Sequence, residues 1–563
     1  MQRKKKVVLH SNSCLANTGF GRHMKFLLSY LFKTGKYELV EYAGGSFTWS
    51  DNVCKSMPWK CYGCLPDDPR ELDKFRGDPS RMQAIQYGEY NINRVLETEK
   101  PDALIMLEDI WGMPYFDKPW INKFPHVFWT PIDSLPLLKV FKEQKDKFGN
   151  LWVKAQFAKD ALAEQGVDSE YMPALIEDKN FKILSKEEKK AVRRKFGVAD
   201  NTFIFGFVFR NQLRKLVGTL IEAFSIFKKA HPEIDCKLFL HTNWSEGWRI
   251  PDFLERFNVR REDVLTTYVC SACKDVSVKP FFGQELNCQN CQSEKKVNTS
   301  NVSIGVEEED LCELYNMCDA YIHPATSGGF EMPVLEALFC GLPVATTNYS
   351  YGTNFTVNTE VFPLDFTLYR EHGSQFDKAQ VLPSSIVEFM EKITSLSKEE
   401  IERKGYNLRQ WALENFDGNK ICAKIEKFID DLPFTDYDFS FNQKIEEKPE
   451  NKTLSIDDII DYKSDKKRIL YVEDGNLGDC VDSIAVLERL HKKFPKSEWD
   501  YYVSTLFPQM FEHLDFIKKT MPCSPALDDV LGMEGIENHK GFFDMAFHPK
   551  ITRNCVDFMK NNF

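Results

Sequence analysis

The hydrophobic pattern divides residues 1–432 into short apolar runs that alternate with amphipathic segments. The apolar runs predict buried strands, which lie at residues 6–10, 101–107, 125–130, 201–209, 236–242 and 319–324. The amphipathic segments predict helices, which lie at residues 23–35, 155–166, 219–230 and 307–318. This alternation is typical of a parallel sheet covered by helices. Because the pattern restarts after residue 180, we predict an α/β fold with two successive Rossmann-like domains.

The same pattern sets the expected domain boundaries. We place the two Rossmann-like domains at residues 1–180 and 181–432. Residues 433–465 are polar and charged, which is typical of a linker. A further α/β unit is expected at 466–563, where the apolar pattern starts again. The length of 563 residues agrees with this division, since a domain usually has roughly 150 residues.

Composition narrows the class of protein. Hydrophobic residues make up 43% of the chain and charged residues 28%, as in globular rather than disordered proteins. No apolar run approaches the roughly 20 residues that span a bilayer. The start of the chain is basic and then apolar for only about four residues, which is shorter than the core of a signal peptide. We therefore expect no membrane span and a cytoplasmic location.

Four of the 16 cysteines have the spacing of a metal site. Cys270 and Cys273 form one C-x2-C pair, and Cys288 and Cys291 form another after 14 intervening residues. Four thiolates in two such turns can surround a zinc ion tetrahedrally, which leaves no open position for catalysis on the metal. We predict a structural zinc ribbon, inserted in the second Rossmann-like domain at residues 268–298; four free thiols are the alternative.

A glycine-rich loop and a helix predict a phosphate-binding site in the stretch SGGFEMPVLEALFCGLPVATTN, residues 327–348. Pro333 suits the first turn of a helix and Gly341 suits its end. Unpaired N–H groups and a partial positive charge make the helix N-terminus a seat for phosphate. Glu336 lies one turn into this helix among apolar residues, where its charge needs a partner. A pair of sugar hydroxyls would supply one; an exposed position or a structural salt bridge are the alternatives.

Two more loops follow predicted strands. The segment RNQLRK brings Arg210, Arg214 and Lys215 to the end of the strand at 201–209, where cations could neutralise a diphosphate or simply be solvated. The segment NTGFGRH, residues 17–23, follows the first strand and is a flexible loop before a helix. A lone G-x-G motif is weak evidence for a ligand site.

Together these three segments resemble family 4 of the retaining glycosyltransferases, which have the GT-B fold, over residues 5–432. GFGR is similar to the family's G-x-G-R loop, and Arg210 and Lys215 match its R-x4-K pair. GGFEMPVLEALFCGLPV matches E-G-F-G-x-P-x-x-E-A-x-x-x-G-x-P-V, and ELYNMCDAYIHPATSGGF resembles the segment before it. The resemblance implies two Rossmann-like domains that face a cleft holding a nucleotide-diphosphate sugar.

The resemblance also implies residue roles. Arg210 and Lys215 would stabilise the donor diphosphate and the leaving group, and Glu336 would bind the ribose. The loop residues Gly19, Gly21, Gly329 and Phe330 would line the donor site. A divalent metal is not expected in the transfer reaction, since the cations and the helix dipole supply the positive charge.

One departure from the family pattern concerns the acid that normally touches the donor sugar. It is expected at position 328, where this chain has Gly328. Glu331 stands where the family has glycine, and we hypothesise that Glu331 supplies the displaced carboxylate. On the acceptor side, Asp133 follows a predicted strand and could orient a hydroxyl or cap a turn. Glu108 is a weaker candidate for the same role.

The unit at 466–563 resembles the beginning of the family 9 heptosyltransferases. Gly475, Gly478 and Asp479 match that family's G-x-x-G-D motif, in which the aspartate can act as a base. The chain is too short for the usual second domain. We expect a partial domain used for docking, acceptor contact or dimerisation.

These observations predict a hexosyl- or pentosyltransferase that moves a sugar from a nucleotide diphosphate to an acceptor hydroxyl with retention. The sequence does not decide whether the acceptor is a modified nucleic-acid base, a glycan, a lipid-linked sugar or a protein. It does not determine the oligomeric state either. The net charge of -11 argues mildly against nucleic acid. The alternative is a non-catalytic scaffold that binds nucleotide sugars, which the loss of an acid at Gly328 favours.

Overall fold

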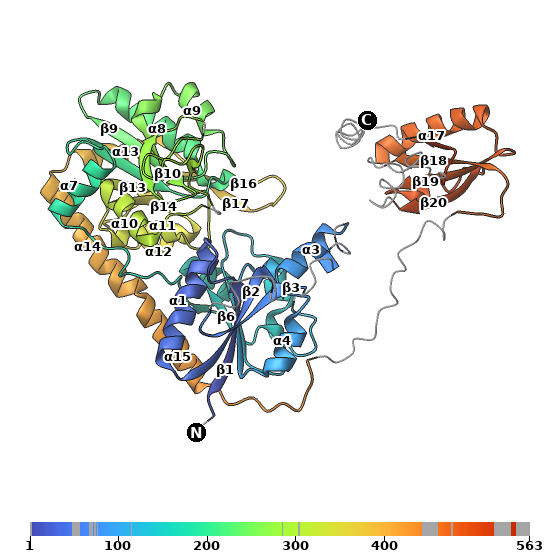
Figure 1. Cartoon of the computed structure of the whole chain (residues 1–563), viewed down its shortest axis with the longest axis horizontal. Helices are drawn as coiled ribbons and strands as arrows, with labels where there is room; N and C mark the ends of the chain where they lie inside the picture. The colour runs from blue at the N-terminus through green and yellow to red at the C-terminus, as the bar shows by residue number, and fades with distance from the viewer. Residues whose placement is uncertain are drawn as a thin grey trace. The chain divides into compact units, whose positions relative to one another are not determined.

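The computed structural model divides into two compact units (Figure 1), Met1–Pro69 with Ser80–Gln443, and Arg70–Pro79 with Lys444–Phe563. It describes residues 3–47, 57–66, 71–72, 75, 77–113, 115–283, 285–301, 304–441, 460–473, 477–522 and 542–547. The larger unit carries the predicted donor-site residues and the four clustered cysteines.

The first domain of the larger unit is built on a seven-stranded parallel sheet of order β3-β2-β1-β4-β5-β6-β7. Its strands are β1 (Lys5–Asn12), β2 (Tyr37–Phe47), β3 (Lys60–Leu65), β4 (Ala103–Leu107), β5 (His126–Thr130), β6 (Leu151–Val153) and β7 (Glu170–Tyr171). Its helices are α1 (Gly19–Thr34), α3 (Pro79–Gln86), α4 (Ile92–Glu99), α5 (Lys139–Glu143) and α6 (Gln156–Glu164), with short 3-10 turns η2 (Ile110–Gly112) and η3 (Lys145–Lys147). The strands β4 and β5 are fully buried, as their apolar runs predict.

The second domain has an eight-stranded sheet whose path is β11-β10-β9-β8-β13-β14-β15, with β12 paired to β10. Its strands are β8 (Phe203–Val208), β9 (Cys236–His241), β10 (Val264–Cys270), β11 (Val276–Pro280), β12 (Val297–Thr299), β13 (Ala320–His323), β14 (Val344–Thr347) and β15 (Phe362–Leu364). Along the path β10-β9-β8-β13-β14-β15 all strand pairs are parallel. The strands β11 and β12 both run antiparallel to β10. The two antiparallel strands belong to the predicted cysteine insertion.

The helices of the second domain cover this sheet, and a separate hairpin lies beside it. They are α7 (Lys186–Lys195), α8 (Val217–Ala230), α9 (Ile250–Arg256), α10 (Glu308–Met317), α11 (Met332–Phe339), α12 (Thr353–Thr356), α13 (Pro383–Thr394) and α14 (Lys398–Phe416), with 3-10 turns η4 (Leu213–Lys215), η5 (Arg261–Asp263) and η6 (Ser350–Gly352). The hairpin is β16 (Phe366–Arg370) and β17 (Asp377–Val381). The helix expected at 332–340 is α11, and Pro333 lies in its first turn.

The last helix of the larger unit, α15 (Gly418–Asp431), returns to the first domain. Figure 1 shows α14 leading from the second domain to α15, which lies near α1. Ile421, Ile425 and Ile429 are buried in the same hydrophobic cluster as residues of α1. The Tyr37 hydroxyl donates to Asp430 at 2.5 Å. The local apolar pattern does not show that α15 packs on the first domain.

The smaller unit has a four-stranded sheet of order β20-β19-β18-β21. Its strands are β18 (Lys467–Glu473), β19 (Trp499–Thr505), β20 (Ile517–Pro522) and β21 (Met545–Phe547). The helix α17 (Leu477–Lys493) packs on them, and the turn η7 (Pro508–Met510) lies between β19 and β20. All of its strand pairs are parallel. Asp479 lies in the first turn of α17, Gly478 lies beside it, and Gly475 lies outside the described residues. The role predicted for Asp479 stays a prediction.

Within the described ranges, no helix combines the length and the apolar character that a bilayer crossing requires.

Candidate active site

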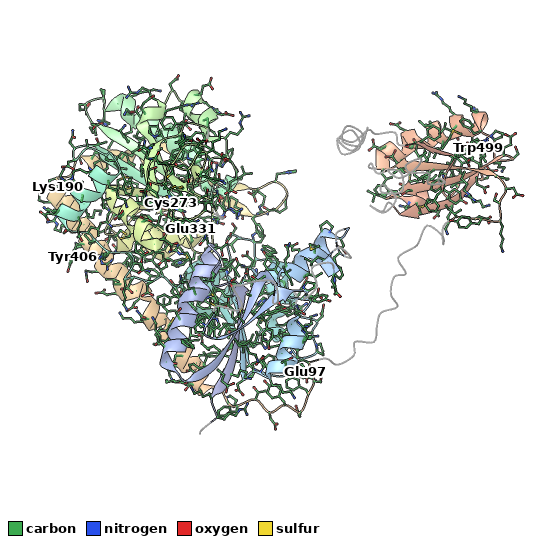
Figure 2. All side chains as sticks on the ribbon, viewed as in Figure 1. Glu97, Lys190, Cys273, Glu331, Tyr406 and Trp499 are labelled. Carbon is green, nitrogen blue, oxygen red and sulfur yellow. The ribbon has the colours of Figure 1, made fainter. Side chains whose placement is uncertain are left out.

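Glu331 forms a buried ion cluster at the carboxyl end of the second sheet. It precedes α11, and its carboxylate accepts hydrogen bonds from Arg214 Nη1 and Lys215 Nζ, both at 2.6 Å. His323 Nε2 at the end of β13 lies 3.3 Å from the same carboxylate. Only 6% of the Glu331 side chain is exposed. Figure 2 marks Glu331 at the level where the two domains of the larger unit meet.

The cluster carries a net positive charge at neutral pH. Burial acts to raise the pKa of Glu331, but the charges of Lys215 and Arg214 outweigh it and hold that pKa well below its usual range. Burial and the Lys215 charge lower the pKa of His323 to about 4, so its ring is neutral. Burial and Arg214 lower the pKa of Lys215 to about 8, which still leaves it mostly protonated. Two cations and one anion therefore stand at the start of α11, where phosphate oxygens are favoured.

The position of Glu331 agrees with the hypothesis of a displaced acid. A Cβ atom on Gly328 would lie 2.7 Å from Glu331 Oε1 and 3.1 Å from Arg214 Nη1. The Glu331 carboxylate therefore occupies the space into which a side chain at position 328 would point. An acid at 328 and the observed Glu331 conformation exclude each other sterically.

The three basic residues of RNQLRK separate into two groups. Lys215 lies in the Glu331 cluster, as does Arg214, to which the family resemblance gives no role. The Arg210 side chain is 59% exposed and lies 3.4 Å from Glu246 instead. Arg214 and Lys215 are neighbours in the turn η4, which follows β8 as the sequence pattern predicts. The role of Arg210 stays a prediction.

Glu336 is satisfied by partners from both domains of the larger unit. Its carboxylate is buried and accepts 2.7 Å hydrogen bonds from Arg22 Nη1 and from the Tyr315 hydroxyl. Arg22 Nε also donates to Glu308 at 2.8 Å. Arg22 is the arginine of the GFGR loop motif. These contacts match the structural salt bridge named as an alternative, and a ribose that takes the place of Arg22 at Glu336 Oε1 would have to break this ion pair.

The glycines of both segments are packed closely. The sequence pattern places Gly19 and Gly21 in a loop before a helix, whereas they form the first turn of α1. A Cβ on Gly21 would collide with the backbone oxygen of Ala16 in the same domain. A Cβ on Gly19 would lie 3.5 Å from Met332 Sδ, and one on Gly329 would collide with Pro131, which follows β5. Gly19 and Gly329 therefore lie where the two domains approach each other near the Glu331 cluster.

Phe330 is partly buried and packs against the core of the second domain. Its ring packs against Phe355 and Phe416 with centroid separations of 5.4 and 6.0 Å. The resemblance implied a place in the donor site, and that role stays a prediction.

Charged groups of the first domain lie at the carboxyl ends of three neighbouring strands. Glu108 and Asp109 follow β4, Asp133 follows β5, and Lys154 follows β6. A Cβ on Gly329 would lie 3.1 Å from Asp133 Oδ1, so this acid faces the second domain. Within the described part of the chain, the Asp109 side chain caps no turn and interacts with Asp133, Lys154 and Arg214 through charge alone. Asp109 and Lys154 were not predicted as site residues, although Asp109 lies two positions after β4 and Lys154 directly follows β6.

Burial perturbs the titration of this group. The pKa of Glu108 rises to about 8 through burial and the neighbouring Asp109. The pKa of Asp109 rises to about 6 through burial and Asp133. Burial lowers the pKa of Lys154 to about 8, and the acids around it act in the opposite direction. Shifts of this kind gather in functional sites, although structural ion pairs produce them too.

The four cysteines of the insertion fit a zinc ion. Their sulfur atoms lie within 4.8 Å of one another. Cys270 Sγ is 3.7 Å from Cys291 Sγ, and Cys273 Sγ is 3.6 Å from Cys288 Sγ. A tetrahedron of sulfurs at the zinc–thiolate distance of about 2.3 Å has edges of roughly 3.8 Å. The predicted cysteine set therefore comes together with a geometry that suits zinc.

Comparisons with known proteins agree with this architecture. Residues 283–404 match the family model of group 1 glycosyl transferases. A serotype-specific mannosyltransferase, WbdA of Escherichia coli, is 32% identical over 68 residues, which are 12% of this chain and 8% of that relative. The chain therefore spans only a small part of the curated relative that it matches.

Solved structures resemble most of the chain in fold. A glycosyltransferase from Rickettsia africae matches with a TM-score of 0.51 and 13% identity, over 76% of this chain and 99% of that one. Sucrose-phosphate synthase from Thermosynechococcus elongatus matches with a TM-score of 0.51 and 13% identity, over 76% of this chain and 98% of that one. The N-terminal domain of Candida albicans trehalose-6-phosphate phosphatase matches with a TM-score of 0.52 and 12% identity, over 76% of this chain and 97% of that one. The predicted GT-B fold is confirmed, and the group 1 match at residues 283–404 supports glycosyl transfer.

Proposed function

We propose that this protein is a glycosyltransferase that moves a hexosyl or pentosyl group from a nucleotide diphosphate to an acceptor hydroxyl, with retention of configuration. The observation that supports this proposal most directly is the buried cluster of Glu331, Arg214, Lys215 and His323 beside the start of α11. Its net positive charge and the helix N-terminus suit a diphosphate leaving group. Glu331 holds both cations in place and lies where it could also meet the donor sugar.

In the proposed reaction, the acceptor hydroxyl oxygen forms a bond to the anomeric carbon of the donor. The bond between that carbon and the diphosphate oxygen breaks, and its electron pair stays on the nucleotide diphosphate. The hydroxyl proton passes to the leaving diphosphate. Lys215 and Arg214 would stabilise the negative charge that develops on this group, as preorganised cations do in other transfer enzymes. Asp133, at the end of β5, would orient the acceptor hydroxyl.

Zinc enters this proposal only as a structural ion. Cys270, Cys273, Cys288 and Cys291 would hold it, and the bound ion would stabilise the insertion without taking part in the transfer.

The direct test of the donor site is a thermal-shift panel of nucleotides and nucleotide sugars. A donor at 100 times its Kd should stabilise the protein by about 2.7 kcal/mol, which raises the Tm by several degrees. The variant Lys215→Met should lose this shift, whereas Lys228→Met should keep it, since Lys228 pairs with Asp263 and not with Glu331. If no nucleotide or nucleotide sugar stabilises the wild-type protein, the proposal fails.

A second prediction concerns the ion pair between Arg22 and Glu336. If a ribose takes Glu336 Oε1, the Arg22→Met variant should bind nucleotides about tenfold more tightly, because no ion pair has to open first. Its Tm without nucleotide should fall by a few degrees, since a buried acid loses its cation. Isothermal titration with the nucleotide diphosphate measures the affinity. Glu308→Gln is the control, because it removes the other Arg22 contact and leaves Glu336 paired. Unchanged affinity in Arg22→Met would refute a ribose that displaces Arg22 from Glu336.

A further inference from the structure

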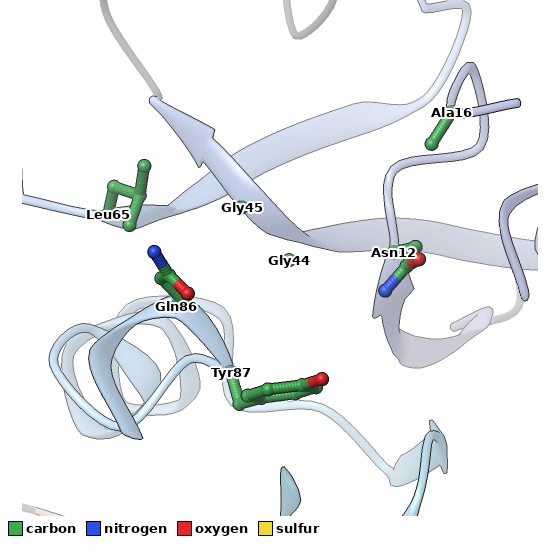
Figure 3. Close-up of a pocket in the computed structure, with 7 residues that line it drawn as sticks. All are labelled: Asn12, Ala16, Gly44, Gly45, Leu65, Gln86 and Tyr87. Atoms are coloured by element: carbon green, nitrogen blue, oxygen red, sulfur yellow. The ribbon is translucent and has the colours of Figure 1, made fainter. Parts of the chain in front are cut away.

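A pocket of about 280 Å³ opens at the carboxyl ends of the first strands of the first domain (Figure 3). Gly44 and Gly45 of β2 form one side of it, and Asn12 of β1 and Gln86 of α3 project toward it from other sides. Since the glycines carry no side chains, a ligand could approach the backbone closely there. The volume lies near the lower end of ligand pockets, which start at about 300 Å³, and suits one small ring.

An aromatic wall bounds this pocket and continues beyond it. Tyr87 lines the pocket, and its ring lies below the two glycines in Figure 3. Trp111 in the turn η2 packs edge-on against Tyr87 with a centroid separation of 5.3 Å, yet 54% of Trp111 is exposed. A Cβ on Gly112 would lie 2.7 Å from the Tyr87 ring, so glycine at 112 is needed for this arrangement. An exposed tryptophan held by a second ring offers an apolar face to a ligand.

Carboxylates stand next to the aromatic wall. Asp109 begins the turn η2 that carries Trp111, and its side chain does not cap that turn. Burial raises the pKa of Tyr87 to about 12, and the negative charges of Glu108 and Asp109 contribute, so the phenol faces these acids and stays protonated. Glu108 accepts a 3.1 Å hydrogen bond from the backbone N–H of Asn12, which lines the pocket. The pocket, the aromatic wall and the acids are therefore parts of one surface.

We propose that Tyr87, Trp111 and Asp109 form the acceptor subsite, and that its ligand is a neutral sugar, such as the end of a glycan. A sugar ring combines an apolar C–H face, which would lie on the aromatic wall, with hydroxyl groups, which would donate to the Asp109 carboxylate, to which no described residue donates a hydrogen bond. A nucleic acid is disfavoured, because Asp109 and Asp133 would repel its phosphates. The inference rests on the proposed transferase function, since it names the acceptor of the same site.

The test uses the full chain and saturation-transfer-difference NMR. The probes are methyl α-D-mannoside, methyl α-D-glucoside, methyl β-D-galactoside and a single-stranded dT20 oligonucleotide. We expect at least one glycoside to bind, and its Kd to rise about tenfold in Trp111→Ala and in Asp109→Asn. Tyr406→Ala should leave the Kd unchanged, because Tyr406 is an equally exposed aromatic residue on α14, at 56% exposure.

The outcomes separate this inference from the proposed function. The thermal shift with nucleotide sugars should be the same in Trp111→Ala and the wild type. If nucleotides bind but glycosides do not, or if Trp111→Ala binds them like the wild type, the acceptor inference is overturned while the transferase proposal stands. Displacement of the glycoside by dT20 would also overturn it. If no nucleotide binds, the proposed donor chemistry fails, whatever the glycosides do.

Discussion

Replacing Glu331 with glutamine should lower kcat for sugar transfer by about 10³-fold, the loss seen when a group that organises charge in the transition state is removed. Glutamine has nearly the shape of glutamate but no charge, so it cannot hold Arg214 and Lys215 as the carboxylate does at 2.6 Å. The two cations would repel each other and move apart. The measurement is single-turnover transfer from a labelled nucleotide sugar, read by mass spectrometry.

A loss of activity in this variant has to be distinguished from a loss of folding. Removing one member of a buried ion pair costs about 3–5 kcal/mol, because the remaining charges stay buried without compensation. The matched control is Asp263→Asn. Asp263 is also buried and also pairs with two cations, Lys228 at 2.9 Å and Arg260 at 2.9 Å, but it lies at the start of β10, away from the carboxyl ends. Its variant should lose a similar amount of stability and keep kcat within about twofold.

A graded series sharpens the assignment of Glu331. Glu331→Asp keeps the charge but shortens the side chain by one methylene, so it should retain more activity than Glu331→Gln. Full activity in Glu331→Gln, with a circular-dichroism spectrum like that of the wild type, would show that the carboxylate plays no part in the reaction. Transfer would then proceed without an acid in place of the one absent at position 328, and the hypothesis of a displaced carboxylate would be refuted.

The sequence allowed the architecture to be predicted because the relevant information is local. Buried runs such as 101–107 and 201–209 became β4 and β8, and Pro333 came to lie in the first turn of α11. The four cysteines met because C-x2-C turns determine their own geometry. Lys215 was predicted to face a diphosphate from a motif in a loop after a strand, where α/β proteins bind ligands.

The partners of these residues could not be read from the sequence, because they come from distant segments. Arg22 pairs with Glu336 across 314 positions, and this contact exists only once two domains are in place. Arg210 and Arg214 look equivalent in RNQLRK, but the turn η4 directs only Arg214 toward Glu331. Asp109 lies two positions after β4 and Lys154 one position after β6, and no local pattern shows that only β5 separates these two strands in the sheet.

Loss of the zinc site should have the largest effect on stability. The wild-type protein, purified without chelator, is expected to contain one zinc per chain, and Cys288→Ser should contain close to none. The insertion has a very small core of its own, made by Tyr268, Cys270, Cys288 and Val297. Segments of this size rarely fold without a metal or disulfide, and a structural zinc ion contributes about 10–16 kcal/mol of apparent binding free energy.

Loss of the zinc site should also destabilise residues outside the insertion, because Cys270 is the last residue of β10, which pairs with β9 in the main sheet. Unfolding of the cysteine turns would therefore fray β10, and we expect the Tm of Cys288→Ser to fall by several degrees. Cys236→Ser is the matched control, since Cys236 is a fully buried thiol on the neighbouring β9 outside the cluster. It should keep its zinc. The measurements are zinc content by inductively coupled plasma mass spectrometry and Tm by calorimetry. A wild-type protein that is fully stable without metal would show that these cysteines are four free thiols.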